Sequence, residues 1–271
     1  MAHGSGSADL ARVSLRQFSF AAVVGALALA ALGATGSSAT AGRASSCLGA
    51  NGSGYSYAGH QATYKGHGVR ATITAQTAPR VKAGHVAGWV GVGGPGQGPN
   101  GEDVWLQAGI ASVNGVAPFS YVEITRPGRD PEFMLVEEGL APGRPHRFAV
   151  LEMGRRPGWW RVWVDGQAVT EPVHLPGSSG RWAPIATAES YAESPSLCNS
   201  FSFRFEGVAV SYGGGGSWRP FVSGYRFLDG GNDLRQLAAA DSRPGMYARK
   251  LSSAGATGAP LPYAFVARSG S

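Results

Sequence analysis

Alternating apolar and polar positions run through most of the chain after about residue 55. In Val69-Arg70-Ala71-Thr72-Ile73-Thr74 an apolar side chain recurs at every second position, which is typical of a strand with one buried face. Turns rich in Gly and Pro separate such segments, so the pattern predicts an antiparallel β-sandwich or barrel. Strands are expected at 69–74, 86–92, 104–110, 119–125, 133–136, 147–153, 159–164, 182–188 and 201–212.

The segment Trp159–Val164 has two faces of unequal character. Trp160, Val162 and Val164 lie on one face of the expected strand, and Trp159, Arg161 and Trp163 lie on the other. Asp165-Gly166 follows directly and predicts a tight hairpin. One face must join the core. The Trp/Arg face either packs under a second layer or forms a platform on which a sugar or peptide stacks.

The first 46 residues differ from the rest. Arg12 and Arg16 precede an apolar run from Phe18 to Leu32, and Ala39-Thr40-Ala41 offers a cleavage site. This order predicts a signal peptide over residues 1–41 and a secreted, extracellular protein, free or associated with the cell wall. The alternatives are a membrane anchor, although the run is shorter than the ~20 residues of a span, and a lipoprotein modified at Cys47.

After removal of residues 1–41, the chain is long enough for one sizeable core. We expect one antiparallel sandwich or barrel domain over residues 42–212. Composition changes at the four-glycine run Gly213–Gly216, and residues 213–271 are rich in Gly, Ser and Pro. We expect them to form a C-terminal extension, in which Pro262–Val266 has the composition of an additional edge strand.

Charge and cysteine content restrict the partners. The net charge of +6 is dispersed rather than clustered, which argues against a nucleic-acid partner. We expect a monomer with no membrane contact once the signal is removed. Cys47 and Cys198 form an even pair in an exported chain and predict a disulfide, with two free thiols as the alternative. The histidines lack metal-binding spacing, so we expect no metal and no cofactor.

Gln107 and Glu189 are the candidate catalytic residues, because Gln107 is a polar residue framed by apolar ones in an expected strand and Glu189 stands at the end of another, among apolar and aromatic residues. Such a pair can hydrolyse an amide. The carboxylate removes a proton from water, which attacks the carbonyl carbon. The Gln amide then donates a hydrogen bond to the water or to the developing oxyanion.

Three ordered segments resemble the eqolisins, the glutamic peptidases. Trp89-Val90-Gly91-Val92 is similar to that family's Trp-Val-Gly-Ile, and Leu106-Gln107-Ala108-Gly109 is similar to its Leu-Gln-Thr-Gly. Ala188-Glu189-Ser190-Tyr191-Ala192-Glu193 resembles its Ala-Glu-Trp-Ile-Val-Glu. The resemblance implies a concanavalin A-like sandwich, or jelly roll, of two antiparallel sheets over residues 42–212, with Gln107 and the first Glu, Glu189, as the catalytic pair.

Weaker matches extend the resemblance over about 65–215. Tyr121-Val122-Glu123, before Pro127, is similar to the family's Tyr-Glu-x-x-Pro, and Phe205–Val210 is similar to its closing strand. The resemblance implies substrate-binding roles for Trp89, Tyr121, Glu123 and Glu193, and a polypeptide substrate.

The chain also departs from the family at three positions. Gly93 stands where the family has an acidic residue, and Ser190 and Ser120 stand where it has Trp. Two other hypotheses therefore remain open. The chain could be a non-catalytic concanavalin A-like module that binds carbohydrate or wall polysaccharide, or a structural exported protein without chemistry.

Overall fold

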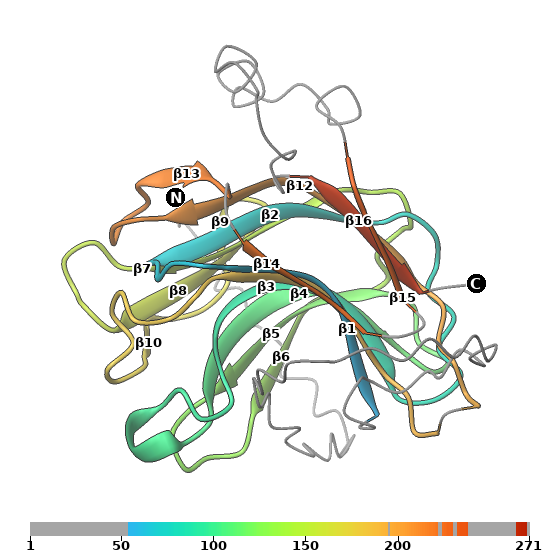
Figure 1. Ribbon diagram of the computed structural model, residues 1–271, viewed down its shortest axis with the longest axis horizontal. Helices are drawn as coiled ribbons and strands as arrows, with labels where there is room; N and C mark the ends of the chain where they lie inside the picture. The colour runs from blue at the N-terminus through green and yellow to red at the C-terminus, as the bar shows by residue number, and fades with distance from the viewer. Residues whose placement is uncertain (1–53, 195, 222–223, 230–231, 238–263, 270–271) are drawn as a thin grey trace, which may run out of the picture.

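Two antiparallel sheets lie face to face in the computed structural model (Figure 1), which describes residues 54–194, 196–221, 224–229, 232–237 and 264–269. This arrangement confirms the expected all-β sandwich. A short 3-10 turn, η1 (Pro99–Gly101), interrupts the loop between the third and fourth strands. No helix in the described ranges is long and apolar enough to cross a membrane. The expected signal peptide and Cys47 lie outside the described residues.

The first sheet has seven strands, and its order brings together segments that are distant in the chain. The strands are, in spatial order, β14 (Gly224–Leu228), β1 (Tyr55–Ala62), β11 (Ile185–Tyr191), β3 (His85–Gly94), β4 (Val104–Val113), β5 (Phe119–Thr125) and β6 (Glu132–Glu137). Strand β11 therefore lies beside β3, which places the two halves of the predicted site on neighbouring parts of one sheet.

The second sheet has nine strands. Its main path is β10 (Val173–His174), β8 (Trp159–Val164), β7 (His146–Glu152), β2 (Gly68–Ala75), β12 (Ser202–Ser211), β16 (Phe265–Ser269) and β15 (Asn232–Gln236). Two short strands lie off this path: β13 (Trp218–Pro220) pairs with β12, and β9 (Gln167–Ala168) pairs with β8. The segment after Tyr212 thus supplies strands to both sheets, and β16 lies between β12 and β15 rather than at an edge.

The core lies between the two sheets and is formed by alternate residues of the strands. Trp160, Val162 and Val164 are buried there, so this face of β8 is the core face. Gly88 on β3 is required by the packing, because a Cβ at this position would come within 2.7 Å of the Phe203 ring from the other sheet. The alternation that predicted the strands therefore also determines which residues point away from the core.

The hairpin after β8 forms as its sequence predicts. Asp165 and Gly166 have φ values of 49° and 87°, the left-handed conformation that a two-residue turn of type I′ requires at both positions. The turn returns the chain as β9, which pairs Ala168 with Trp163.

Candidate active site

Gln107 and Glu189 point to the same side of the seven-stranded sheet. Gln107 on β4 lies opposite Gly91 on β3, and Gly91 lies opposite Ile185 on β11. Glu189 is four residues beyond Ile185, an even number, so its side chain leaves the same face. This is the outer face, because the residues on either side of Gln107, Leu106 and Ala108, are fully buried in the core between the sheets.

Glycines beside Trp89 give its indole room on this face. Gly109 lies directly opposite Trp89, and a Cβ there would come within 2.7 Å of the Trp89 Cα. At Gly91 a Cβ would lie 3.1 Å from Cζ3 of the same indole and 2.9 Å from the Cβ of Gln107. The indole therefore extends along β3 toward the Gln107 side chain.

The Gln107 amide is bonded to residues of β5. Its Nε2 donates to the Tyr121 hydroxyl and to Oε2 of Glu123, both at 3.3 Å. The indole Nε1 of Trp105, two residues before Gln107 on β4, donates to Oε1 of Glu123 at 2.9 Å. Both carboxyl oxygens of Glu123 thus accept a hydrogen bond from β4.

Glu189 has a different set of partners. Nε1 of Trp89 donates to its Oε2 at 3.1 Å, and Nε2 of His85 lies 2.9 Å from its Oε1. Both partners come from β3, the strand between Glu189 and Gln107. Glu189 and Gln107 are also buried to the same degree, each 8% exposed. An aromatic ring and an imidazole therefore hold the carboxyl group in place.

The carboxyl group of Glu123 lies in the electrostatic field of Glu189. The pKa of Glu123 is raised from its ordinary 4.5 to about 7, mainly by burial and in addition by the charge of Glu189. The hydrogen bonds from Trp105 and Gln107 and the charge of His85 oppose this rise only in part. Glu123 is therefore protonated through the acidic range.

Side chains from distant strands converge on this face. The pKa of Tyr57, on β1, is raised by burial and also by the charges of Glu189 and Glu123. The charges of Glu189 and Glu123 therefore act on a side chain from β1 as well as on their own strands. Burial and the charge of Glu189 likewise raise the pKa of Tyr121.

Gln107 and Glu189 are nevertheless not direct neighbours in the sheet. Their backbone positions are separated by two strand-to-strand steps, about 10 Å, and by four residues along β11, about 13 Å, which together make roughly 16 Å. The Trp89 indole occupies the space between them, with its N–H on Glu189 and its other end beside Gln107. The amide and carboxyl that bond directly are Gln107 and Glu123. That Gln107 and Glu189 share one water molecule stays a prediction.

Comparison with solved structures finds this fold in a peptidase. The crystal structure of scytalido-glutamic peptidase with a peptide-based transition-state analogue matches with a TM-score of 0.50 and 14% identity, over 80% of this chain and 98% of that chain. The chain shares the fold of a glutamic peptidase. SCP-B, an eqolisin family member in complex with the tripeptide Ala-Ile-His, matches with a TM-score of 0.46 and 13% identity, over 80% and 98% of the two chains.

A β-glucanase from Bacillus licheniformis is more distant, with a TM-score of 0.34 and 17% identity over 48% of this chain and 56% of that one. No protein-family model matches the sequence, and the search of curated proteins found no match. At these identities the likeness to the glutamic peptidase concerns the fold. The chemistry has to be argued from the residues of this chain.

Two of the positions that depart from the eqolisin pattern lie away from the candidate site. Ser190 lies opposite Val86, and Ser120 lies opposite Ile110; both are buried on the inner face of the sheet. The family's two Trp residues are thus replaced at positions that point away from Gln107 and Glu189.

The third departure, Gly93, has a local cause. Its φ is +87°, and a Cβ would lie 2.3 Å from the backbone oxygen of Val104. An acidic side chain cannot be accommodated there without moving the backbone. Trp105 lies directly opposite Gly93 on β4 and supplies the N–H that contacts Glu123.

The structure does not bring every predicted residue into the cluster. Glu193 is exposed in the loop after β11 and takes no part in the hydrogen bonds around Gln107 and Glu189. Cys198 lies in the same loop, and its expected partner Cys47 is outside the described residues, so the disulfide stays a prediction. Within the described ranges, no group of three or more His, Cys, Asp or Glu side chains is arranged to hold a metal ion.

Sequence analysis missed three residues of the cluster: His85, Trp105 and Tyr57. The first two were detectable from alternation alone, because His85 is four residues before Trp89 and Trp105 is two before Gln107, which puts each on the same face. Tyr57 could not be found in this way. It reaches the cluster because β1 pairs with β11, opposite Glu189.

Proposed function

We propose that the chain is a secreted hydrolase of the glutamic-peptidase type that cleaves peptide bonds with water. The observation that carries the proposal is the convergence of one amide and two carboxyl groups on one sheet face. Gln107 bonds Glu123, while the charge of Glu189 contributes to the raised pKa of Glu123. Pairs of titratable groups in different environments are characteristic of acid–base sites.

In the proposed reaction Glu189 is the general base. It takes a proton from water as the water oxygen attacks the carbonyl carbon, which gives a tetrahedral intermediate with a negatively charged oxygen. The Gln107 amide N–H stabilises that oxygen. The carbon–nitrogen bond then breaks, and the leaving nitrogen takes the proton back from Glu189. No metal and no covalent intermediate is required.

Glu123 supports this reaction in its protonated form. Its oxygens accept hydrogen bonds from Trp105 and Gln107, and the protonated group also retains an O–H to donate toward the oxyanion. Since its pKa is raised to about 7, this donor is present through the acidic range and is lost above it. The proposal therefore predicts cleavage at acidic pH.

The test is an activity assay on the purified chain starting at residue 42, with unfolded polypeptide as substrate, from about pH 2 to about pH 7. Glu189→Gln and Gln107→Ala should each abolish turnover, and Glu123→Gln should reduce it less. Glu171→Gln and Gln167→Ala are matched controls, because both residues are exposed on the other side of the sandwich. Cleavage should resist chelators, pepstatin and serine reagents. No cleavage across this range would leave the non-catalytic binding module as the better hypothesis.

A second candidate activity, hydrolysis of a glycosidic bond, follows from the same two carboxyl groups, because the pKa of Glu123 is raised to about 7. A glycosidase uses two carboxyl groups, one as the acid and the other as the base or nucleophile, and Glu123 could supply the acid. The variants distinguish the two reactions. A glycosidase should lose activity equally with Glu123→Gln and Glu189→Gln, whereas a peptidase should depend mainly on Glu189.

Export and the disulfide belong to the same proposal. A secreted hydrolase should begin near Gly42, directly after the Ala-x-Ala site, which N-terminal sequencing of the mature protein from the culture medium can establish.

A disulfide bond between Cys47 and Cys198 would connect the start of the mature chain to the loop after β11. A thiol assay on unreduced, denatured protein should then detect no free thiol. Two titratable thiols per chain would exclude the bond.

A further inference from the structure

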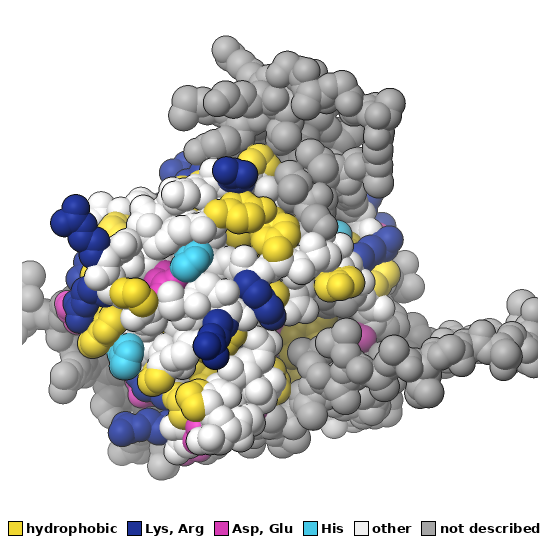
Figure 2. Space-filling model, turned by 60° about the vertical axis from the view of Figure 1, so that its left-hand side comes forward, with side chains coloured by type: hydrophobic (Ala, Val, Ile, Leu, Met, Phe, Trp, Pro, Cys, Tyr) yellow, Lys and Arg dark blue, Asp and Glu magenta, His cyan; other side chains and the backbone are white. Residues whose placement is uncertain are grey.

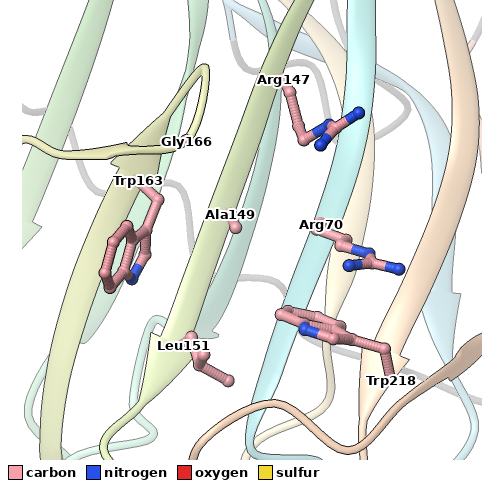
Figure 3. A pocket seen from close by; sticks show the side chains of 7 residues that line it. All are labelled: Arg70, Arg147, Ala149, Leu151, Trp163, Gly166 and Trp218. Carbon is pink, nitrogen blue, oxygen red and sulfur yellow. The ribbon is translucent and has the colours of Figure 1, made fainter.

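The outer face of the nine-stranded sheet carries a separate hollow of about 170 Å³ (Figure 3). It lies on the opposite sheet from Gln107 and Glu189. Two tryptophans and two arginines dominate its wall. The lining residues are Arg70, Arg147, Ala149, Leu151, Trp163, Gly166 and Trp218.

The register of three strands explains why this face is hollowed. Ala149 on β7 pairs with Trp163 on β8 and with Arg70 on β2, so a short side chain lies between two long ones. In the next row Leu151 pairs with Gly68, which has no side chain. The hollow therefore has a low apolar floor, with an indole on one side and a guanidinium on the other.

The four-glycine run after β12 positions the second indole, that of Trp218. The chain turns through Gly213–Gly216, where Tyr212 N donates to Ser217 O, and Gly216 adopts a φ of +105°. The turn leads into β13 and places Trp218 under the Arg70 guanidinium, whose carbon lies 4.7 Å from the ring centroid. A segment with the composition of a flexible linker thus positions one wall of the hollow.

The lining carries positive charge and no acidic side chain. Arg147 is exposed. The acidic residue bonded to its backbone, Asp165, accepts hydrogen bonds from Arg147 N at 2.6 Å and His146 Nδ1 at 2.9 Å. From the side where β7, β8, β10 and β13 lie, basic and hydrophobic side chains intermingle and acidic ones are few (Figure 2).

We propose that this hollow binds an acidic polysaccharide, a chain of uronic-acid type. The apolar face of a pyranose ring can stack on Trp163, as flat apolar groups do on indole. Trp218, with the Arg70 guanidinium over its ring, forms the opposite wall. Sugar carboxylates can pair with the guanidinium of Arg147, which has the planar fork that carboxylates match. A peptide strand has no backbone to pair with here, because β7 and β2 are each hydrogen-bonded to neighbours on both sides.

Trp159 provides an internal comparison on the same strand face. It is four residues from Trp163, but its ring is already stacked on His174, with centroids 4.8 Å apart, and the Arg156 guanidinium lies 4.0 Å from it. It does not line the hollow. The proposal therefore assigns binding to Trp163 and not to Trp159.

The test uses calorimetric titration of the chain from residue 42 that carries Glu189→Gln, so that any hydrolysis is excluded from the measurement. Three probes separate ring stacking from charge: oligogalacturonate, its methyl ester, and polyglutamate. Oligogalacturonate should bind with a salt-sensitive affinity, at least about tenfold tighter than either of the other two. Equal binding of polyglutamate would indicate an acidic-peptide site and overturn the proposal, as would equal binding of the methyl ester or no binding at all.

Variants locate the site. Trp163→Ala and Arg147→Gln should each weaken oligogalacturonate binding about tenfold or more. Trp159→Ala should change it by less than about twofold, as should Arg129→Gln, at an exposed arginine in the β5–β6 loop of the other sheet. Arg147 is exposed, so its replacement leaves the core intact and the test does not depend on how Trp163→Ala folds. Unchanged binding by both Trp163→Ala and Arg147→Gln would overturn the proposal. Peptidase assays do not enter this result, so it stands or fails independently of the proposed function.

Discussion

The indole N–H of Trp89 donates a hydrogen bond of 3.1 Å to Oε2 of Glu189. The two residues lie on adjacent strands, β3 and β11, and are 100 positions apart in the chain. Because the other end of the indole lies beside Gln107, Trp89 occupies the centre of the candidate site. It is both a wall of the site and a partner of the proposed base.

Trp89→Phe should separate these two roles. The ring is largely kept, but Glu189 loses a donor, and hydrogen bonds to charged groups contribute about 1.5–3 kcal/mol. We expect kcat/KM for peptide cleavage to fall roughly tenfold to hundredfold. Trp182→Phe is the matched control, because its N–H bonds Gln97 O, away from Glu189. Equal losses in the two variants would show that the Trp89 bond has no special role in activity.

Glu123→Gln should change how stability depends on pH. The folded-state pKa of Glu123 is raised from 4.5 to about 7, so the folded state holds a proton that the unfolded state releases. The contribution of this bound proton to the free energy of unfolding is present in full below pH 4.5. It is lost as pH rises through about 7, and the loss is at most ~3 kcal/mol. Urea unfolding should therefore show a smaller decline from pH 4.5 to 8 in the variant. Glu132→Gln, at an exposed ion pair, is the control. Parallel curves for wild type and Glu123→Gln would contradict the raised pKa.

His60 should have the opposite effect on stability. It is buried, neither ring nitrogen has a hydrogen-bond partner in the described structure, and burial lowers its pKa from 6.5 to about 4. The unfolded state then binds a proton that the folded state does not, so stability present above pH 6.5 is lost as pH falls through about 4. His60→Phe, which keeps a ring against Phe265, should reduce this loss. The slope of unfolding free energy between pH 6.5 and 4 is the measurement, and an unchanged slope would contradict the prediction.

Gly93→Ala should destabilise the fold more than Gly101→Ala. Both glycines have a positive φ, +87° and +79°, where a side chain costs roughly 1–2 kcal/mol. Only at Gly93 would the new Cβ also meet backbone, the Val104 oxygen at 2.3 Å; at Gly101 no atom lies within 4 Å. Thermal unfolding of the two variants compares these costs. Similar losses would show that the backbone near Gly93 adjusts easily.

Alternation of side chains determined much of the fold from sequence. Phe119–Thr125 and Trp159–Val164 form strands with the expected bounds, since the two faces of a strand are defined by every second residue. The same local rule assigned Trp160 and Trp159 to opposite faces. It also identified Gln107 and Glu189 as polar residues in strands, which the structure places on one outer face.

The partners of those residues depended on tertiary structure. Gln107 bonds Glu123 because β4 and β5 pair in one particular register, and a shift by one residue would turn Glu123 to the other face. The raised pKa of Glu123 comes from its burial and from the charge of Glu189 on β11, both of which depend on the assembled sheet. Trp218 reaches Arg70 only through the turn at Gly213–Gly216 and the pairing of β13 with β12. The alternation of a strand depends on consecutive residues, so it can be recognised in the sequence. The register of paired strands and the contacts between side chains depend on residues that are distant in the chain, and the sequence alone does not determine them.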